Sequence, residues 1–302
     1  MSVLVVGSVA MDTIETPFGK VSNALGGSAV YSSFSASFFS PVKMVAVIGN
    51  DFPKEYKDIL REKEIDLQGL QEEEGKTFHW EGFYDYDLNT AHTISTELNV
   101  FENFEPVIPE FYKNTPYVFL ANIDPELQLK VLNSIKHPKL VVGDTMNFWI
   151  DKKRDALLET LKKIDILIVN DAEARDLSDE SNLIKAAKKI RSFGPKSLII
   201  KKGEHGALLF SNDSIFSAPA FPLESIYDPT GAGDTFAGGF IGYLARTGDL
   251  SDDNMRRAVI KGSTMASFCV ENFTLNRMRN LTETEINARC RKLKELSHFE
   301  NI

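Results

Sequence analysis

The sequence is poor in cysteine and has no excess of basic residues, and both shortages exclude classes of protein. Its two cysteines, Cys269 and Cys290, belong to no Cys-x-x-Cys pair. A disulfide framework is therefore not expected, and a reducing compartment is the natural setting. Asp and Glu number 43 against 34 Lys and Arg, which gives a formal net charge of −9. This charge argues against a broad nucleic-acid interface, because such an interface needs a basic surface.

Long apolar runs are also missing. The uninterrupted apolar segments are shorter than the roughly 20 residues that a membrane-spanning helix needs. The chain opens on Val3–Gly7, a strand-like run, without the charged start, apolar stretch and cleavage site of a secretory leader. The five histidines show no metal-ligand spacing. We therefore expect a cytoplasmic protein that binds neither membrane nor nucleic acid.

The chain does contain a repeated alternation of short apolar runs with segments of helical period. The runs are rich in Val, Ile and Leu without polar alternation, which is typical of strands buried on both faces of a parallel sheet. Helical period is found in Leu127–Ile135 and Leu183–Ile190. The alternation predicts one α/β domain over residues 1–302, a three-layer α/β/α sandwich with a mostly parallel central sheet. The predicted strands are Val3–Val9, Lys43–Ile48, Tyr117–Ala121, Leu140–Gly143, Ile166–Val169 and Leu198–Lys201.

Two segments interrupt this alternation. Residues 13–23 are too irregular for a helix that crosses between parallel strands. Residues 76–101 are rich in Thr, Tyr, Phe and Trp, with Asp87-Leu88-Asn89 as a turn, which is typical of a β-hairpin or small meander. We expect the two segments to form one small sheet outside the main core, where it serves as a lid.

The most informative string is Asp228-Pro229-Thr230-Gly231-Ala232-Gly233-Asp234, which continues into a segment of helical period. Unpaired N–H groups and the helix dipole favour an anion at a helix N-terminus, and small residues let it approach closely. Asp234 could accept the proton of an attacking hydroxyl. A glycine-rich turn with an Asp cap is the alternative. Gly238 and Gly239 weaken this alternative, because glycine destabilises a helix interior and is expected there only where close packing or substrate access requires it.

This string resembles the second signature of the ribokinase-like (PfkB) carbohydrate kinase family. The first signature is partly present as Gly26-Gly27-Ser28-Ala29-Val30-Tyr31, with Tyr31 where the family has an Asn. The resemblance extends from residue 3 to about residue 270. It implies a kinase that uses ATP and Mg²⁺. In that kinase Asp234 would be the catalytic base, and Gly231, Ala232 and Gly233 would form the anion hole.

On the acceptor side, the resemblance implies residues that bind substrate hydroxyls. Asp12 follows the first strand, and a carboxylate there can accept two hydroxyl hydrogen bonds, although a loop carboxylate is the alternative. The double glycine is equally compatible with turn chemistry. Tyr31, Phe148 and Trp149 could stack on a substrate ring, with core packing as the alternative. The implied acceptor residues are Asp12, Gly26, Gly27, Tyr31, Asp144 and Asn147.

On the donor side, Asn170 and Glu173 form the family's Asn-x-x-Glu motif. They would face the phosphates and Mg²⁺, Glu173 through water, and a helix N-cap is the alternative. Lys201 stands where the family commonly has Thr, and it could contact phosphate or be solvated. Met265–Phe273 takes the place of the adenine walls, or is a core helix. The implied nucleotide residues are Asn170, Lys201, Gly203, Gly206, Thr230, Gly231 and Gly233.

The two lid segments are almost free of cations, which bears on the acceptor. A substrate that already carries phosphate needs Arg or Lys, and only Lys20 and Lys76 occur in these segments. We therefore rank a neutral sugar or polyol first and a nucleoside of the adenosine type second. A non-catalytic relative that binds nucleotide or sugar stays open. A nicotinamide dehydrogenase is disfavoured, because no Gly-x-Gly-x-x-Gly follows the first strand.

The resemblance carries two further expectations. Family members often dimerise through the lid, and the aromatic-rich strand Phe78–Tyr86 is suited to such a homodimer. Some members also use a monovalent cation near the anion hole, with ligands drawn largely from the backbone.

Overall fold

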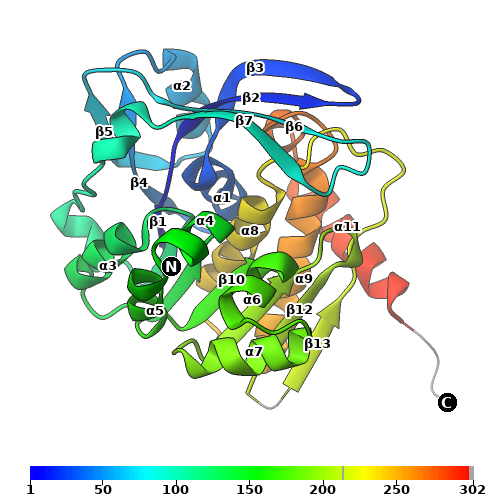
Figure 1. Ribbon diagram of the computed structural model, residues 1–302. Coiled ribbons are helices and arrows are strands. Elements are labelled where there is room, and N and C mark those ends of the chain that lie inside the picture. Colours follow the sequence, from blue (N-terminus) through cyan, green and yellow to red (C-terminus); the bar gives the residue numbers. More distant parts are fainter. Residues whose placement is uncertain (213, 299–302) are drawn as a thin grey trace.

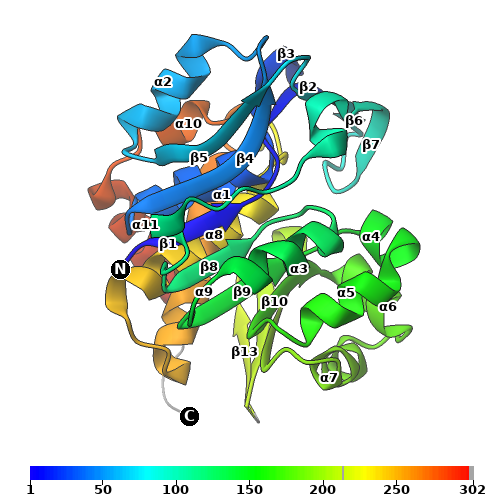
Figure 2. The same cartoon turned by 90° about the vertical axis from the view of Figure 1, so that its left-hand side faces the viewer.

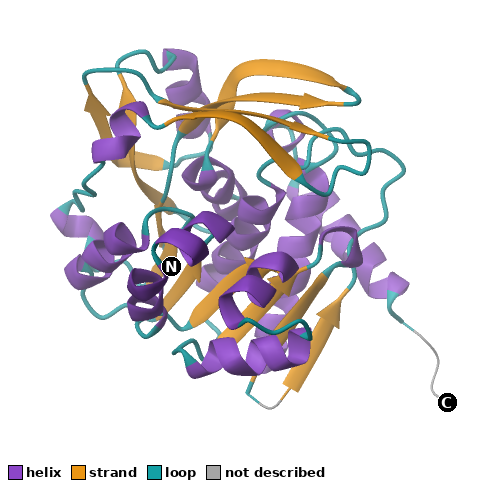
Figure 3. Ribbon diagram, viewed as in Figure 1, coloured by secondary structure: helices purple, strands orange, loops and turns teal. Residues whose placement is uncertain are grey.

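The computed structural model describes residues 1–212 and 214–298 and contains a large sheet between helices and a smaller sheet above it (Figures 1 and 3). The nine strands of the large sheet follow the order β13-β12-β11-β10-β9-β8-β1-β4-β5. Their bounds are β1 Val3–Val6, β4 Val42–Gly49, β5 Asp66–Glu73, β8 Tyr117–Leu120, β9 Leu140–Asp144, β10 Ile166–Asn170, β11 Ser197–Lys201, β12 Ala207–Ser211 and β13 Ser214–Ala218. All pairings from β5 to β11 are parallel, and β12 and β13 are antiparallel. The predicted mostly parallel sheet is confirmed.

Helices cover both faces of this sheet, as the view of Figure 2 shows. Their bounds are α1 Ser28–Ser37, α2 Lys54–Glu62, α3 Pro125–Ser134, α4 Asn147–Lys152, α5 Arg154–Leu161, α6 Asp171–Ser178, α7 Leu183–Ser192, α8 Ala232–Thr247, α9 Asp252–Cys269, α10 Asn276–Arg279 and α11 Glu283–Leu296. Helices α1, α8 and α9 share one apolar core with the sheet, and α3, α5, α6 and α7 share the other. Within the described residues, none of these helices combines the length and apolarity needed to cross a membrane.

The two glycines inside α8 are explained by close helix packing. A Cβ atom at Gly238 would overlap the carbonyl oxygen of Ser32 in α1. A Cβ atom at Gly239 would lie 2.9 Å from Cγ of Met265 in α9. Each helical glycine costs about 1 kcal/mol relative to Ala, and the burial that the short approach permits offsets this. Packing, which we expected as one of two reasons for these glycines, is therefore sufficient.

The smaller sheet joins the two segments predicted to form a lid. Its strands are β2 Ala10–Thr16, β3 Gly19–Gly26, β6 Phe78–Tyr84 and β7 Ala91–Glu97, in the order β3-β2-β6-β7. The central pair β2 and β6 is parallel, and each forms an antiparallel hairpin with its outer neighbour. The turn at Leu88 is closed by its N–H, which donates to the carbonyl of Asp85 at 3.0 Å. One small sheet built from both segments is confirmed.

Several boundaries differ from the sequence-based expectation. The first strand ends at Val6, not Val9, because the chain leaves the large sheet and enters the lid at Ala10. The first lid segment therefore begins three residues earlier than expected. The strands β5, β12 and β13 were not predicted. β5 and β13 are edge strands with many exposed or half-buried residues, so they lack the continuous apolar runs that mark the inner strands, whereas β12 is an inner strand whose short apolar run was not recognised.

Candidate active site

The turn before α8 leaves two backbone donors free for an anion. Gly231 caps the helix in the left-handed conformation, with φ +73°, and a side chain there would overlap the ring of Tyr31. The N–H of Ala232 donates to the carbonyl of Pro229 at 3.2 Å. In the described part of the chain, the N–H groups of Gly231 and Gly233 have no such acceptor. A helix N-terminus with two free donors favours bound negative charge.

Asp228 anchors this turn, a role that the sequence analysis did not assign to it. Its side chain is buried, and Oδ1 accepts a hydrogen bond from the N–H of Thr230 at 2.9 Å. Oδ2 accepts one from the N–H of Thr274 at 3.0 Å, which ties the turn to the segment after α9. Burial raises the pKa of Asp228 above its usual value, and these bonds oppose the rise. An Asp two residues before a turn residue is a known sequence signal for this contact.

Asp234 lies in the first turn of α8 and stays partly accessible. Burial and then the charge of Asp144 raise its pKa to about 7, while Lys201 opposes the rise. A carboxylate with a pKa near neutral pH can both be ionised and hold a proton during the reaction. The geometry therefore suits the proton-accepting role that we predicted for this residue.

Lys201, at the end of β11, is held inside the site and not solvated. Its Nζ lies 3.7 Å from Oδ2 of Asp144, and its side chain is 18% exposed. The same atom lies 2.8 Å from the position that a Cβ of Gly233 would take. Burial alone would lower its pKa, but Asp144, Glu173 and Asp234 together raise the pKa of the ammonium group. Lys201 is therefore mostly withdrawn from solvent, with its ammonium group beside Asp144 and the glycine turn, which favours the phosphate contact of the two alternatives.

Asn170 and Glu173 form a reciprocal cap at the start of α6. Oδ1 of Asn170 accepts from the N–H of Glu173 at 2.8 Å, and Oε2 of Glu173 accepts from the N–H of Asn170 at 2.7 Å. The helix-cap alternative is therefore realised. Burial raises the pKa of Glu173 to about 7, against the opposing charge of Lys201.

These residues fit Mg²⁺ held mainly through water. Among the described residues, no group of three or more His, Cys, Asp and Glu side chains converges as a metal site. Mg²⁺ commonly keeps several waters and uses few carboxylates together with substrate phosphates. Glu173 is buried and Asp234 is half-buried, and both interact with Lys201. Two such carboxylates suit a Mg²⁺ ion that they contact through its bound waters.

Asp144 ends β9 beside Lys201, although we expected it among the acceptor residues. Its Oδ1 accepts from the N–H of Thr145 at 2.8 Å, and its Oδ2 faces Lys201. Burial raises the pKa of Asp144, and Lys201 opposes the rise. The carboxylate is thus the principal counter-ion of the buried ammonium group.

Asp12 and the double glycine lie side by side. A Cβ atom at Gly26 would overlap the Asp12 carboxylate, so the glycine makes room for it. Gly27 has φ +97°, and a Cβ there would lie 2.5 Å from the carbonyl oxygen of Ser8. Burial and then the charge of Asp228 raise the pKa of Asp12 to about 8, while a hydrogen bond from the Gly27 backbone lowers it. Asp12 is therefore a buried group that hydroxyl donors could satisfy.

Tyr31 supports the glycine turn from beneath. The residue is 1% exposed, and its ring contacts the position of Gly231. Its hydroxyl has no hydrogen-bond partner among the described residues, and burial raises its pKa well above the usual value. No ring face of Tyr31 is open, so the stacking surface that we expected from it is absent. Of the other two stacking candidates, Phe148 is exposed. Trp149 uses its Nε1–H to donate to Oδ1 of Asn122 at 2.9 Å.

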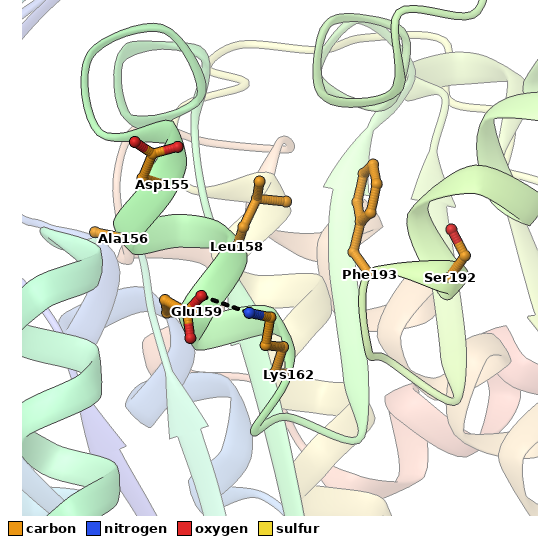
Figure 4. Close-up of a pocket in the computed structure, with 7 residues that line it drawn as sticks. All are labelled: Asp155, Ala156, Leu158, Glu159, Lys162, Ser192 and Phe193. Atoms are coloured by element: carbon orange, nitrogen blue, oxygen red, sulfur yellow. Dashed lines mark hydrogen bonds and ion pairs between the residues drawn. The ribbon is translucent and has the colours of Figure 1, made fainter.

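Two hollows of the surface lie on the side of the molecule formed by α4 to α7. Asn147 is exposed and lines a broad hollow between α4 and α6, together with Arg154 and Arg175. A second hollow, of about 490 Å³, lies between α5 and the end of α7 (Figure 4). Lys162 and Glu159 form an ion pair across part of its wall. Asn147 thus lines the hollow between α4 and α6, and the site around Lys201 is identified by its chemistry.

The remaining predicted nucleotide residues have mixed surroundings. Gly203 and Gly206 shape a short turn after β11, with φ +54° and +81°. The backbone N–H of Lys202 donates to the carbonyl of Gly206 at 2.7 Å and closes this turn. Met265 and Phe268 of α9 are buried in the core, so the core-helix alternative holds for both.

Tyr84, at the end of the lid strand β6, was missed from the sequence. Its hydroxyl accepts a hydrogen bond from Oγ1 of Thr230 at 3.2 Å. An aromatic residue that ends a predicted lid strand is the one local signal that could have indicated it.

Comparison with known proteins places the chain in a family. Residues 1–278 match the model described as pfkB family carbohydrate kinase. A cytidine kinase of Thermococcus kodakarensis is 33% identical over 252 residues, which cover 82% of this chain and 89% of that protein. A nucleoside kinase of Methanocaldococcus jannaschii is 27% identical over 233 residues, covering 76% and 73%. The chain belongs to the pfkB family of carbohydrate kinases, and the predicted resemblance is confirmed.

Solved structures agree on the fold. The nucleoside kinase of Methanocaldococcus jannaschii superposes with a TM-score of 0.77 at 22% identity, over 96% of this chain and 98% of that one. A candidate ribokinase II of E. coli in complex with ATP and Mg²⁺ has a TM-score of 0.79 at 19% identity, over 96% and 99%. The predicted ribokinase-like fold is confirmed. Family membership makes the protein a phosphotransferase that uses ATP and Mg²⁺ and has an alcohol group as acceptor.

Proposed function

We propose that this protein transfers the γ-phosphoryl group of ATP to a sugar hydroxyl of a nucleoside. Two relatives that align with most of the chain are named for cytidine and for nucleosides. Sequence reasoning ranked a neutral sugar or polyol first and a nucleoside second. A nucleoside presents a neutral sugar ring with hydroxyl groups, so it meets the same physical requirement. Because of these relatives, we now rank a nucleoside above a neutral sugar or polyol as the acceptor.

One observation carries the kinase assignment most directly. The ammonium group of Lys201 and the free N–H groups of Gly231 and Gly233 converge beside the carboxylate of Asp234. Charge that develops on a transferring phosphoryl group needs fixed donors and cations, and the attacking hydroxyl needs a base next to them. Both requirements meet at one turn.

Each residue then has a chemical task. Asp234 accepts the acceptor hydroxyl proton as the oxygen attacks, and its pKa near 7 allows this at neutral pH. Gly231, Gly233 and Lys201 stabilise the negative charge of the transferring group. Asp12 accepts hydrogen bonds from acceptor hydroxyls. Bound Mg-ATP supplies the phosphoryl group and a divalent charge, and Glu173 would hold the metal through water.

The lid favours an uncharged acceptor. Lys20 is one of its two cations, and its Nζ lies 3.3 Å from Glu15 and 3.5 Å from Glu81. Both partners are lid carboxylates, so this cation is already neutralised. A phosphorylated acceptor would meet excess negative charge here. Tight binding of a sugar phosphate would contradict this part of the proposal.

The test is a coupled ADP-release assay with Mg-ATP and a panel of pyrimidine and purine nucleosides, neutral sugars, polyols and sugar phosphates. We expect turnover with a nucleoside, and a loss of about 10²–10⁴-fold in kcat for Asp234→Asn. Turnover with sugars alone would reject the nucleoside and keep the kinase. Binding of ATP without ADP release on any acceptor would favour the non-catalytic alternative. Unchanged kcat in Asp234→Asn would remove the proposed base.

We further infer association of two copies through the lid, in a reducing compartment. Phe83 and Ile94 are exposed on the β6–β7 hairpin, which leaves apolar area for a partner copy. The proposed reducing compartment is compatible with the two cysteines, which are free thiols.

The dimer is tested by light scattering. A single monomeric mass at micromolar concentration would contradict it. Ile94→Glu should dissociate it, while Ile215→Glu, another exposed site outside the lid, should not.

A further inference from the structure

A hydrogen bond links the lid directly to the catalytic turn. Oγ1 of Thr230 donates to the hydroxyl of Tyr84 at 3.2 Å, across 146 positions of sequence. Tyr84 ends β6, which pairs in parallel with β2, the strand that carries Asp12. Thr230 directly precedes Gly231. The bond therefore joins the sheet that holds the acceptor carboxylate to the turn that holds the transferring charge.

The turn is built so that a displacement of Thr230 would reach its donors. The N–H of Thr230 is fixed by Asp228, and the next residue, Gly231, rests on the ring of Tyr31. The carbonyl of Thr230 also accepts a hydrogen bond from Sγ of Cys269 at 3.6 Å, so all of these supports come from the main domain. The side-chain hydroxyl of Thr230, in contrast, is bonded to a lid residue, Tyr84.

The surroundings of Tyr84 keep its hydroxyl neutral and able to accept this bond. Burial raises its pKa, and the charges of Asp228 and Asp12 raise it further, against the hydrogen bond from Thr230. The observed contact of this hydroxyl is the bond from Oγ1 of Thr230. Its removal leaves a donor without its acceptor in a partly buried site.

The hydroxyl of Tyr56 in α2 also donates to the carbonyl of Asn23 in β3 at 2.8 Å, but this bond holds the lid to α2 and not to the turn. Other contacts between the lid and the main domain are looser. The ring of Phe18, in the β2–β3 turn, lies 5.8 Å from the ring of Tyr227, and both side chains are about half exposed. Near the other hairpin, Oδ1 of Asn89 lies 3.7 Å from the position of a Cβ at Gly203. Contacts of this kind tolerate lid movement. Only a directional bond such as that of Tyr84 specifies one lid position relative to the turn.

We infer that Tyr84 is a positioning residue that couples closure of the lid over the acceptor to the orientation of the Gly231–Gly233 donors. The inference rests on the proposed function. With the lid closed, the bond fixes Thr230 and aims the donors at the transferring group. Without an acceptor the lid is free to open, and ATP hydrolysis, in which water takes the phosphoryl group and ADP leaves, proceeds without this support.

The test is a double-mutant cycle with Tyr84→Phe, Thr230→Val and the double variant, each close in shape to the original residue. Tyr86→Phe is the control, because Tyr86 is 85% exposed two positions away. We expect Tyr84→Phe to lower kcat for acceptor phosphorylation about 3- to 10-fold, the range for one hydrogen bond. KM for ATP and the rate of acceptor-independent hydrolysis should not change. The double variant should be no slower than the slower single variant.

Additive losses in the cycle would overturn the inference. So would an equal fall of phosphorylation and hydrolysis, which indicates general damage to the turn. A second measurement does not need turnover: hydrogen exchange of the β6 amides in the presence of Mg-ATP. Either single substitution should speed exchange there, and the second should add nothing. If no nucleoside is phosphorylated but this exchange cycle is coupled, the proposed acceptor fails and the lid contact stands.

Discussion

The ammonium group of Lys201 and the carboxylate of Asp144 lie 3.7 Å apart, between the ends of β11 and β9. The Asp144 side chain is 6% exposed and the Lys201 side chain 18% exposed, so both charges have limited access to water. Glu173 and Asp234 share the same cation. One lysine therefore balances a cluster of acids beside the glycine turn, and this balance governs several measurable properties.

Removal of this cation should cost both stability and activity. In Lys201→Met, Asp144 loses its counter-ion, and we expect a loss of up to about 3 kcal/mol in the free energy of unfolding. Asp144→Asn in the same chain should restore most of that stability, because the carboxylate nearest to the lost ammonium group is then neutral. The kcat should stay low in both variants, since the charge at the turn is gone. Thermal unfolding and ADP release measure the two effects, with Lys196→Met as an exposed control.

The rate of transfer should rise with pH through a midpoint near 7. Asp234 must be ionised to accept a proton, and its pKa is raised to about 7 by burial and by Asp144. Below the midpoint the base is protonated, so kcat falls as pH falls. Lys201 lowers this pKa, and Lys201→Met should therefore move the midpoint to higher pH. A profile that is flat between pH 6 and 8 would contradict the assignment of the base.

The contribution of Asp12 to stability should fall as pH rises from about 4 to 8. The pKa of Asp12 is raised from 3.8 to about 8 in the folded state, so the folded chain holds a proton that the unfolded chain has released. Its contribution is complete below the unfolded pKa and is lost as pH rises through the folded pKa. Asp12→Asn should raise Tm by a few degrees at pH 8 and much less near pH 4. The exposed Asp176→Asn should show no such pH-dependent gain.

Two glycines of the turn should fail in different ways. In Gly231→Ala the residue must keep a left-handed backbone, and its Cβ overlaps the ring of Tyr31. We expect a loss of about 2 kcal/mol or more in the free energy of unfolding, and a loss of activity as well. Gly233→Ala meets only the flexible end of Lys201, at 2.8 Å. Its Tm should stay close to that of the native chain while kcat falls, because the ammonium group is displaced. Equal destabilisation of both variants would contradict this distinction.

Local sequence determined the framework of the molecule. Continuous apolar runs marked the inner strands, because a strand buried on both faces has no polar positions, and helical period marked α3 and α7. The string from Asp228 to Asp234 predicted a glycine turn at a helix N-terminus, since its chemistry lies in consecutive residues. Edge strands β5 and β13 escaped, because exposed positions break the apolar run.

Only the tertiary structure decided the partners. Asp144 faces Lys201 because β9, β10 and β11 are adjacent parallel strands that end at the same edge of the sheet. Tyr31 is buried beneath Gly231 because α1 and α8 approach through glycine, which no periodicity reveals. Tyr84 meets Thr230 because the chain forms the turn next to the lid 146 positions after the lid strand. Sequence patterns report which residues are buried, whereas the pairing of distant side chains depends on strand order and helix packing.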